Sequence, residues 1–157
     1  AVFRNDLDEL SQRGVRLRII GKRERFPEDL QEQMTDAEAL TANNTKMSLN
    51  IAANFGGRWD IANAAKKLAF MVKEGNIRPE DIDEDSFSRH LSLEGMVRPD
   101  ICIRTGGDHR LSNFLLWDMA YTELFFTECF WPDFDEEMLN VAFDWFYERK
   151  RRFGKRS

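Results

Sequence analysis

Residues 101–113 have the sequence ICIRTGGDHRLSN, a short apolar strand followed at once by a turn rich in glycine and arginine. Adjacent glycines adopt positive φ easily and let backbone N–H groups approach a ligand closely. Arg104 and Arg110 offer forked donors to phosphate oxygens, and Ser112 adds a hydroxyl. This chemistry predicts a phosphate or diphosphate site; the alternative is a tight Gly-Gly turn with solvated arginines.

A second segment of the same kind, NFGGR at 54–58, follows the apolar stretch 47–53. Strand patterns alternate with helical patterns along the chain, which favours βαβ units and a parallel sheet. The carboxyl ends of parallel strands share one edge, where ligands of such sheets bind. We therefore expect both glycine-arginine turns to open at the same edge.

The remaining elements follow from hydrophobic spacing and from glycine, proline and asparagine stops. We expect helices before Gly14 and over 27–43, 59–74, 85–91 and 135–151, and strands over 15–20, 47–53, 100–104 and 124–127. Repeats and flexible linkers are lacking. The pattern predicts one α/β domain over 1–157, a mostly parallel sheet flanked by helices.

Composition is that of a globular protein, with 42% hydrophobic and 32% charged residues in 157. Six of the 23 basic residues lie in 149–156, whereas the net charge is −5. This basic tail suggests a local anion contact rather than nucleic-acid binding, or simply a solubilising terminus. Two cysteines without a C-x-x-C pair and no long apolar run fit a cytoplasmic protein that could still touch a membrane surface.

Two further residues could complete an anion site. Glu123, at the start of the apolar run after Thr122, is a candidate Mg²⁺ ligand, since magnesium is held by carboxylates and phosphate oxygens; the alternative is a surface glutamate. His109 could bind the metal or a phosphate, transfer a proton, or be a structural turn residue. The many aromatics of 114–134 indicate core packing for the most part, and would also suit an elongated apolar substrate.

Three ordered motifs carry a family resemblance: RTGGDHRLSNFLLW at 104–117, YTEL at 121–124 and WPDF at 131–134. With NIAANFGGRWD at 50–60 and RRFG at 151–154, they resemble the cis-prenyltransferases over essentially the whole chain. That family has a Rossmann-like fold and adds isopentenyl diphosphate units in cis to an allylic diphosphate such as farnesyl diphosphate. The bacterial members make undecaprenyl diphosphate, the precursor of the lipid carrier for peptidoglycan and other cell-wall polymers.

The resemblance also implies roles for individual residues. The diphosphate of isopentenyl diphosphate would be held by Arg104, Arg110, Leu111 and Ser112. Mg²⁺ would be bound by Glu123 and His109. Arg152 and Gly154 match an Arg-x-Gly tail that reaches the active site of the other subunit in a homodimer. The product would leave through transient contact with the membrane surface.

One departure from the family is large. Its Asp-Gly-Asn-Gly-Arg-Trp motif, which holds the essential aspartate, and its Phe-Ser-x-Glu-Asn-Trp motif do not occur here. We therefore expect a C-terminal part with the sheet incomplete at its N-terminus, no catalytic residue of its own and no activity alone. The alternatives are a non-catalytic accessory subunit, which would not need the arginines, and a nucleotide-binding module, which lacks its glycine-rich loops.

Overall fold

The computed structural model describes the backbone of residues 2–149 and the side chains from residue 7 onward. Its helices are α1 (Val2–Gln12), α2 (Glu28–Thr41), α3 (Gly57–Lys73), α4 (Glu84–Ser88) and α5 (Glu136–Tyr147), and its strands are β1 (Val15–Ile20), β2 (Met47–Ala52), β3 (Ile101–Arg104) and β4 (Glu123–Phe126). Short 3₁₀ turns lie at Arg23–Arg25, Pro79–Asp81 and Trp131–Asp133. Every element expected from the sequence is present, with ends that differ by a few residues.

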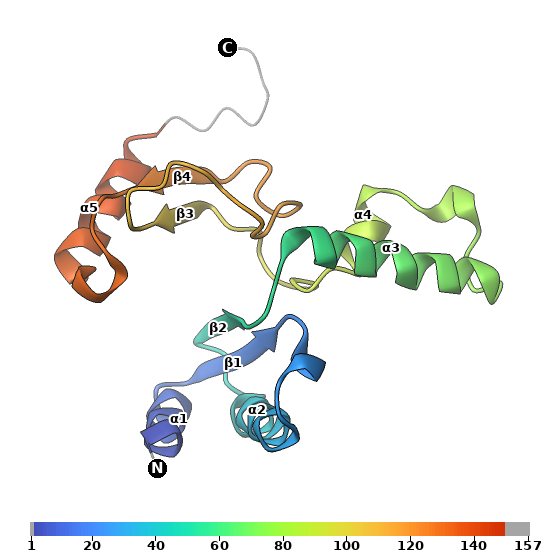
Figure 1. Cartoon of the computed structure of the whole chain (residues 1–157), viewed down its shortest axis with the longest axis horizontal. Helices are drawn as coiled ribbons and strands as arrows, with labels where there is room; N and C mark the ends of the chain where they lie inside the picture. Colours follow the sequence, from blue (N-terminus) through green and yellow to red (C-terminus); the bar gives the residue numbers. More distant parts are fainter. Residues whose placement is uncertain (1, 150–157) are drawn as a thin grey trace. The chain divides into compact units, whose positions relative to one another are not determined.

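The strands form two parallel pairs, β1 with β2 and β3 with β4 (Figure 1). This confirms the α/β class with parallel strands and flanking helices. The chain divides into two compact units, residues 1–92 and 93–157, with one pair in each. The expectation of a single domain, and that of both turns at one sheet edge, remain predictions.

In the first unit, α1 and α2 pack against β1 (Figure 1). The core consists of Leu17 and Ile19 from β1 with Met34 and Ala37 from α2. Strand β2 pairs with β1 in register, Val15 opposite Met47. The unit is thus a β-α-β crossover in which one face of β1 is covered by helices.

The outer edge of β1 is closed by side chains rather than by another strand. The Leu17 N–H donates to the buried Thr41 hydroxyl at 3.0 Å, and the Ile19 N–H donates to Glu38 at 2.6 Å. Arg23 binds both the Ile19 carbonyl and Glu38. Burial alone would raise the pKa of Glu38, but the hydrogen bonds from Arg23 and Ile19 outweigh it and lower the pKa. Because its edge groups are used, β1 ends the sheet on this side.

Asp60, in the first turn of α3, ties that helix to the end of the first unit. Asp60 is 3% exposed, and its carboxylate accepts hydrogen bonds from the Ser92 N–H at 3.1 Å and from the Ser92 hydroxyl at 2.7 Å. A buried carboxylate needs such partners. The contact fixes the chain just before the second unit begins.

The second unit places α5 against β4 (Figure 1). Phe125 meets Trp145 edge-to-face at 5.3 Å, and the Asp135 side chain caps the helix. Several aromatics of 114–134 are exposed rather than buried, so the packing role expected for most of them does not hold for Phe114, Tyr121, Phe130 and Trp131. A short strand pair with one helix offers too little surface to cover them.

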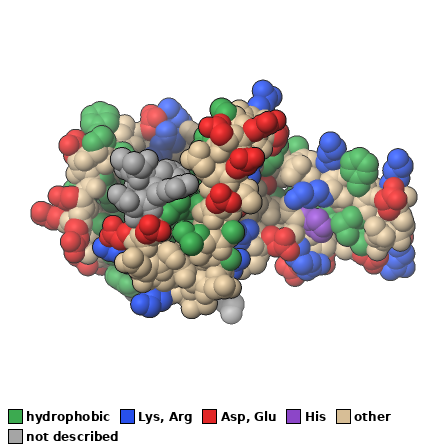
Figure 2. Space-filling model, turned by 90° about the horizontal axis from the view of Figure 1, so that it is seen from below, with side chains coloured by type: hydrophobic (Ala, Val, Ile, Leu, Met, Phe, Trp, Pro, Cys, Tyr) green, Lys and Arg blue, Asp and Glu red, His purple; other side chains and the backbone are tan. Residues whose placement is uncertain are grey.

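The surface carries mixed charges. On the face shown in Figure 2, acidic, basic and apolar side chains are interspersed. Within the described part of the chain, no helix has the length and apolar character needed to span a bilayer.

Candidate diphosphate-binding site

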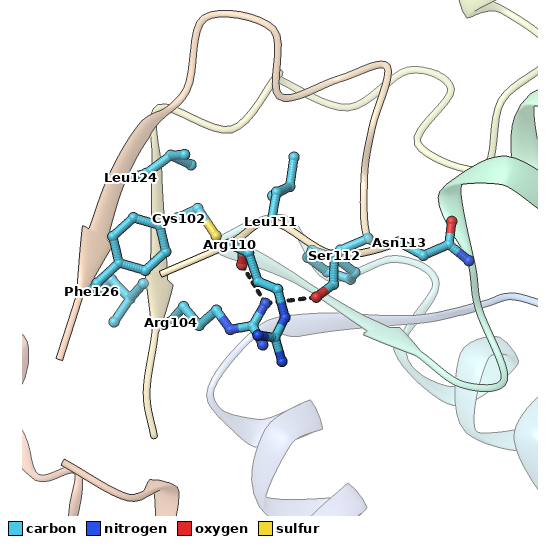
Figure 3. A pocket seen from close by; sticks show the side chains of 10 residues that line it. Cys102, Arg104, Arg110, Leu111, Ser112, Asn113, Leu124 and Phe126 are labelled. Carbon is cyan, nitrogen blue, oxygen red and sulfur yellow. Dashed lines mark hydrogen bonds between the residues drawn. The ribbon is translucent and has the colours of Figure 1, made fainter. Parts of the chain in front are cut away.

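A pocket lies at the carboxyl end of β3, within the second unit (Figure 3). Its volume is about 370 Å³. Ten residues line it: Cys102, Ile103, Arg104, Arg110, Leu111, Ser112, Asn113, Phe114, Leu124 and Phe126. Four of the residues predicted to hold a diphosphate, Arg104 and 110–112, therefore face one cavity.

The two arginines are gathered into one polar cluster. Arg104 donates through Nη1 to the Arg110 carbonyl and to Ser112 Oγ at 2.9 Å, as Figure 3 shows. Through Nη2 it donates to Asp108 Oδ2 at 2.8 Å, and Arg110 donates to the same oxygen at 2.5 Å. Asp108 was not predicted from the sequence. The sequence did contain a signal for it, since Asp108 is an acidic residue between two arginines in a glycine-containing turn.

The backbone N–H groups of the Gly-Gly turn have other partners than the sequence predicts. Gly106 and Gly107 have φ of +85° and +77°, the left-handed conformation that glycine favours. Their N–H groups, however, donate to the carbonyls of Cys129 at 2.9 Å and Thr127 at 3.0 Å. The prediction that these amides reach a ligand is wrong for this structure, because the turn uses them to bind the segment after β4. An anion would meet guanidinium groups here.

The opposite wall of the pocket is apolar. Leu124 and Phe126 project from β4, and Leu111 projects from the turn (Figure 3). Burial raises the pKa of the Cys102 thiol on the neighbouring strand, and Arg104 partly offsets this. An uncharged thiol is compatible with this wall. The pocket thus joins a cationic rim to a hydrocarbon-like wall, which suits a small ligand with an anionic head.

The two predicted metal ligands are not brought together. His109 stacks on Phe126, with ring centroids 5.0 Å apart, and its Nε2 lies 3.9 Å from Glu128. Glu123 pairs with Ile101, whereas Arg104 pairs with Phe126 at the other end of the strands, about 10 Å away. Glu123 does not line the pocket.

The residues that the structure describes therefore do not assemble the predicted metal site. The described residues contain no group of three or more His, Cys, Asp or Glu side chains arranged to hold one. The assignment of Glu123 and His109 as Mg²⁺ ligands therefore remains a prediction. Arg152 and Gly154 lie outside the described residues, so their assignment is likewise untested.

Comparison with known proteins identifies relatives along nearly the whole chain. Residues 1–154 match the Prenyltransf family model, described as undecaprenyl diphosphate synthase. The chain is 50% identical over 150 residues, 96% of its length, to the ditrans,polycis-undecaprenyl-diphosphate synthase ((2E,6E)-farnesyl-diphosphate specific) of Escherichia coli. It is 49% identical over 153 residues, or 98% of its length, to the same enzyme of Vibrio cholerae. It spans only 59% and 61% of these two relatives.

Solved structures agree with this assignment. The lavandulyl diphosphate synthase of Lavandula x intermedia, in complex with dimethylallyl diphosphate, matches with a TM-score of 0.93 and 42% identity, over 97% of this chain and 66% of that one. A probable undecaprenyl diphosphate synthase of Campylobacter jejuni matches with a TM-score of 0.80 and 30% identity, over 98% and 72% respectively. The match of fold and sequence therefore extends over both units.

Proposed function

The chain belongs to the cis-prenyltransferase family, and we propose that it is the C-terminal part of an undecaprenyl diphosphate synthase. The whole enzyme would add isopentenyl diphosphate units in cis to farnesyl diphosphate, as the names of its curated relatives describe for them. Its product would serve peptidoglycan and other cell-wall polymers. The part described here would supply the site for isopentenyl diphosphate.

One observation carries this proposal: two guanidinium groups and the Ser112 hydroxyl converge on a pocket whose other wall is apolar (Figure 3). Isopentenyl diphosphate has the same division, a diphosphate joined to a five-carbon hydrocarbon. The diphosphate would bind Arg104 and Arg110 through charge-assisted hydrogen bonds. The hydrocarbon would lie along Leu124 and Phe126.

In this arrangement the pocket residues bind and orient isopentenyl diphosphate and form no covalent bond with it. The double bond of isopentenyl diphosphate supplies the electron pair for the new carbon–carbon bond. The diphosphate group of the allylic substrate would leave with the electrons of its carbon–oxygen bond, and a proton would then be lost from the condensed product. Fixing the isopentenyl group in line with the allylic carbon lowers the entropic cost of this step.

The proposal extends to features of the whole enzyme. It is an Mg²⁺-dependent prenyltransferase of the cytoplasm that acts as a homodimer and touches the membrane surface when product leaves. Asp108 balances one of the two positive charges of Arg104 and Arg110, so a bound diphosphate needs further positive charge. Mg²⁺ and the basic tail, with Arg152, are the proposed sources. The cluster of arginines and Ser112 also argues against a purely accessory subunit, which has no use for it.

A turnover assay tests the function. The full-length protein is incubated with farnesyl diphosphate, labelled isopentenyl diphosphate and Mg²⁺, and the products are separated by chain length. We expect long cis-polyprenyl diphosphates, and no elongation by residues 1–157 alone or after chelation of the metal. A full-length protein that binds a nucleotide but neither binds nor elongates with isopentenyl diphosphate contradicts the proposal.

A further inference from the structure

We propose that Asp108 is a positioning residue for the diphosphate site: it holds the Arg110 guanidinium beside that of Arg104 before any ligand arrives. One carboxylate oxygen, Oδ2, accepts hydrogen bonds from both arginines, at 2.8 Å from Arg104 and 2.5 Å from Arg110. The inference rests on the proposed function, since it assigns a role within that site.

The two arginines depend on Asp108 to different degrees. Arg104 is 26% exposed and has further partners in the Arg110 carbonyl and Ser112. The Arg110 side chain is 65% exposed and binds Asp108. Because the Arg110 side chain extends into solvent, its contact with Asp108 is what directs its guanidinium toward Arg104.

Repulsion between the cations makes the carboxylate necessary. Two guanidinium groups that share one oxygen lie within a few ångströms of each other, and like charges so close repel. Without an anion between them, Arg110 is free to turn into solvent, and a diphosphate must then pay the cost of ordering it. With Asp108 in place, the donors of both arginines are ordered beforehand.

An opposing role is conceivable: Asp108 could compete with the diphosphate for the arginines. The two roles predict opposite signs. A competitor, once neutralised, leaves a site that binds diphosphate more tightly, because one negative charge is gone. A positioning residue, once neutralised, leaves a site that binds more weakly despite the added positive charge.

The experiment measures binding of inorganic diphosphate to the full-length protein by calorimetry, which requires no turnover. We expect Asp108→Asn to weaken binding about tenfold, from the loss of charge-assisted hydrogen bonds. Asp108→Glu keeps the carboxylate and should restore most of the affinity. Glu128→Gln makes the same change in net charge beside Gly107 but contacts neither arginine, and should stay within about twofold of the native protein.

A double-mutant cycle identifies the arginine through which Asp108 acts. We expect Asp108→Asn to add nothing to Arg110→Ala, and to add part of its effect to Arg104→Ala, in which Arg110 keeps its partner but the repulsion from Arg104 is gone. In the steady state, Asp108→Asn should raise KM for isopentenyl diphosphate about tenfold and leave KM for farnesyl diphosphate unchanged. Tighter or unchanged diphosphate binding by Asp108→Asn overturns the inference. If the native protein binds diphosphate in this way but makes no polyprenyl product, the proposed function fails and the inference stands.

Discussion

Two segments of this chain look alike in sequence and differ in structure. Residues 54–58 and 104–107 both join two glycines to an arginine directly after a parallel strand. In the first, Gly56 is extended, with φ of −156°, and Gly57 begins the 17-residue helix α3. In the second, Gly106 and Gly107 are both left-handed, and no helix follows before β4. The same residue types therefore start a helix in one place and a turn in the other.

The difference also extends to how each unit uses polar groups. In the first unit, Thr41 and Glu38 satisfy N–H groups of β1, bonds that hold the fold and that a ligand cannot replace. In the second, Arg104 and Arg110 bind Asp108 and Ser112 at an open pocket, bonds that an anion can join or exchange. Substitutions in the first should change stability, and those in the second should change ligand binding.

The largest effect is expected for Arg104→Ala in the full-length protein. Arg104 donates hydrogen bonds to three different groups from a position at the end of β3, so its loss removes both a ligand donor and the organisation of Ser112. We expect KM for isopentenyl diphosphate to rise roughly 100-fold. Arg104→Lys should restore little, because an ammonium group does not reproduce the forked geometry.

Arg58→Ala is the matching change in the other segment. Arg58 lies on the exposed surface of the first turn of α3. Its removal should raise KM for isopentenyl diphosphate far less than that of Arg104. Equal effects from the two substitutions would show that both segments contact this diphosphate, and the distinction between them would fail.

Thr41→Val tests the first unit and keeps the side-chain shape. Thr41 is fully buried and accepts the Leu17 N–H at 3.0 Å while donating to the Ala37 carbonyl. Valine leaves that N–H buried without a partner, which costs about 1–3 kcal/mol of unfolding free energy. Denaturant unfolding should show this loss, while diphosphate affinity at a temperature where the protein is folded stays unchanged. A change in affinity without a change in stability would contradict the division of roles.

Hydrophobic spacing, together with glycine, proline and asparagine stops, predicted every α-helix and strand of the described residues to within a few residues at the ends. It could not predict how β1 ends the sheet. That depends on Thr41 and Glu38, which lie more than a dozen residues further along on α2 and reach the strand only once the helix has packed. The exposure of Phe130 and Trp131 was missed for a related reason, since burial depends on what surrounds a residue in space.

At the site, the sequence predicted that Arg104, Arg110 and Ser112 would meet, because all three lie within one short turn. It failed for the glycine amides, whose partners at 127 and 129 are brought close only by the pairing of β3 with β4. It also gave Glu123 a place beside Arg104. Parallel pairing instead puts Glu123 at the far end of the strands, because Glu123 begins its strand whereas Arg104 ends the neighbouring one.

Gly107→Ala should lower the free energy of unfolding less than Thr41→Val does. A Cβ at this position would lie 2.5 Å from Glu128 Oε2, but Glu128 is an exposed, flexible side chain that can move aside. The left-handed φ of +77° cannot be relieved in this way, and it accounts for about 1–2 kcal/mol. Gly56, with φ of −156°, carries no such backbone strain. Combining Gly107→Ala with Glu128→Ala separates the two causes, since it removes the steric conflict only.

Glu38→Gln should cause the smallest loss of unfolding free energy among these substitutions, and this loss depends on pH. Glutamine can still accept the Ile19 N–H but loses its charge against Arg23, so we expect a loss of about 1 kcal/mol at neutral pH. The folded-state pKa of Glu38 is lowered from 4.5, so its carboxylate stabilises the fold above the unfolded-state pKa. That stabilisation is lost as the pH falls through the folded-state pKa, and the native and variant proteins should converge in acid.

Chemical unfolding of both proteins between neutral and acid pH measures this convergence, with Glu32→Gln on the exposed side of α2 as the control. The control should follow the native protein at every pH. A constant gap between native and Glu38→Gln would mean that the strand edge depends on hydrogen bonding alone, without charge. The Arg23–Glu38 pair would then stabilise the first unit through its hydrogen bonds, whereas the paired charges of the second unit would still order the arginine turn.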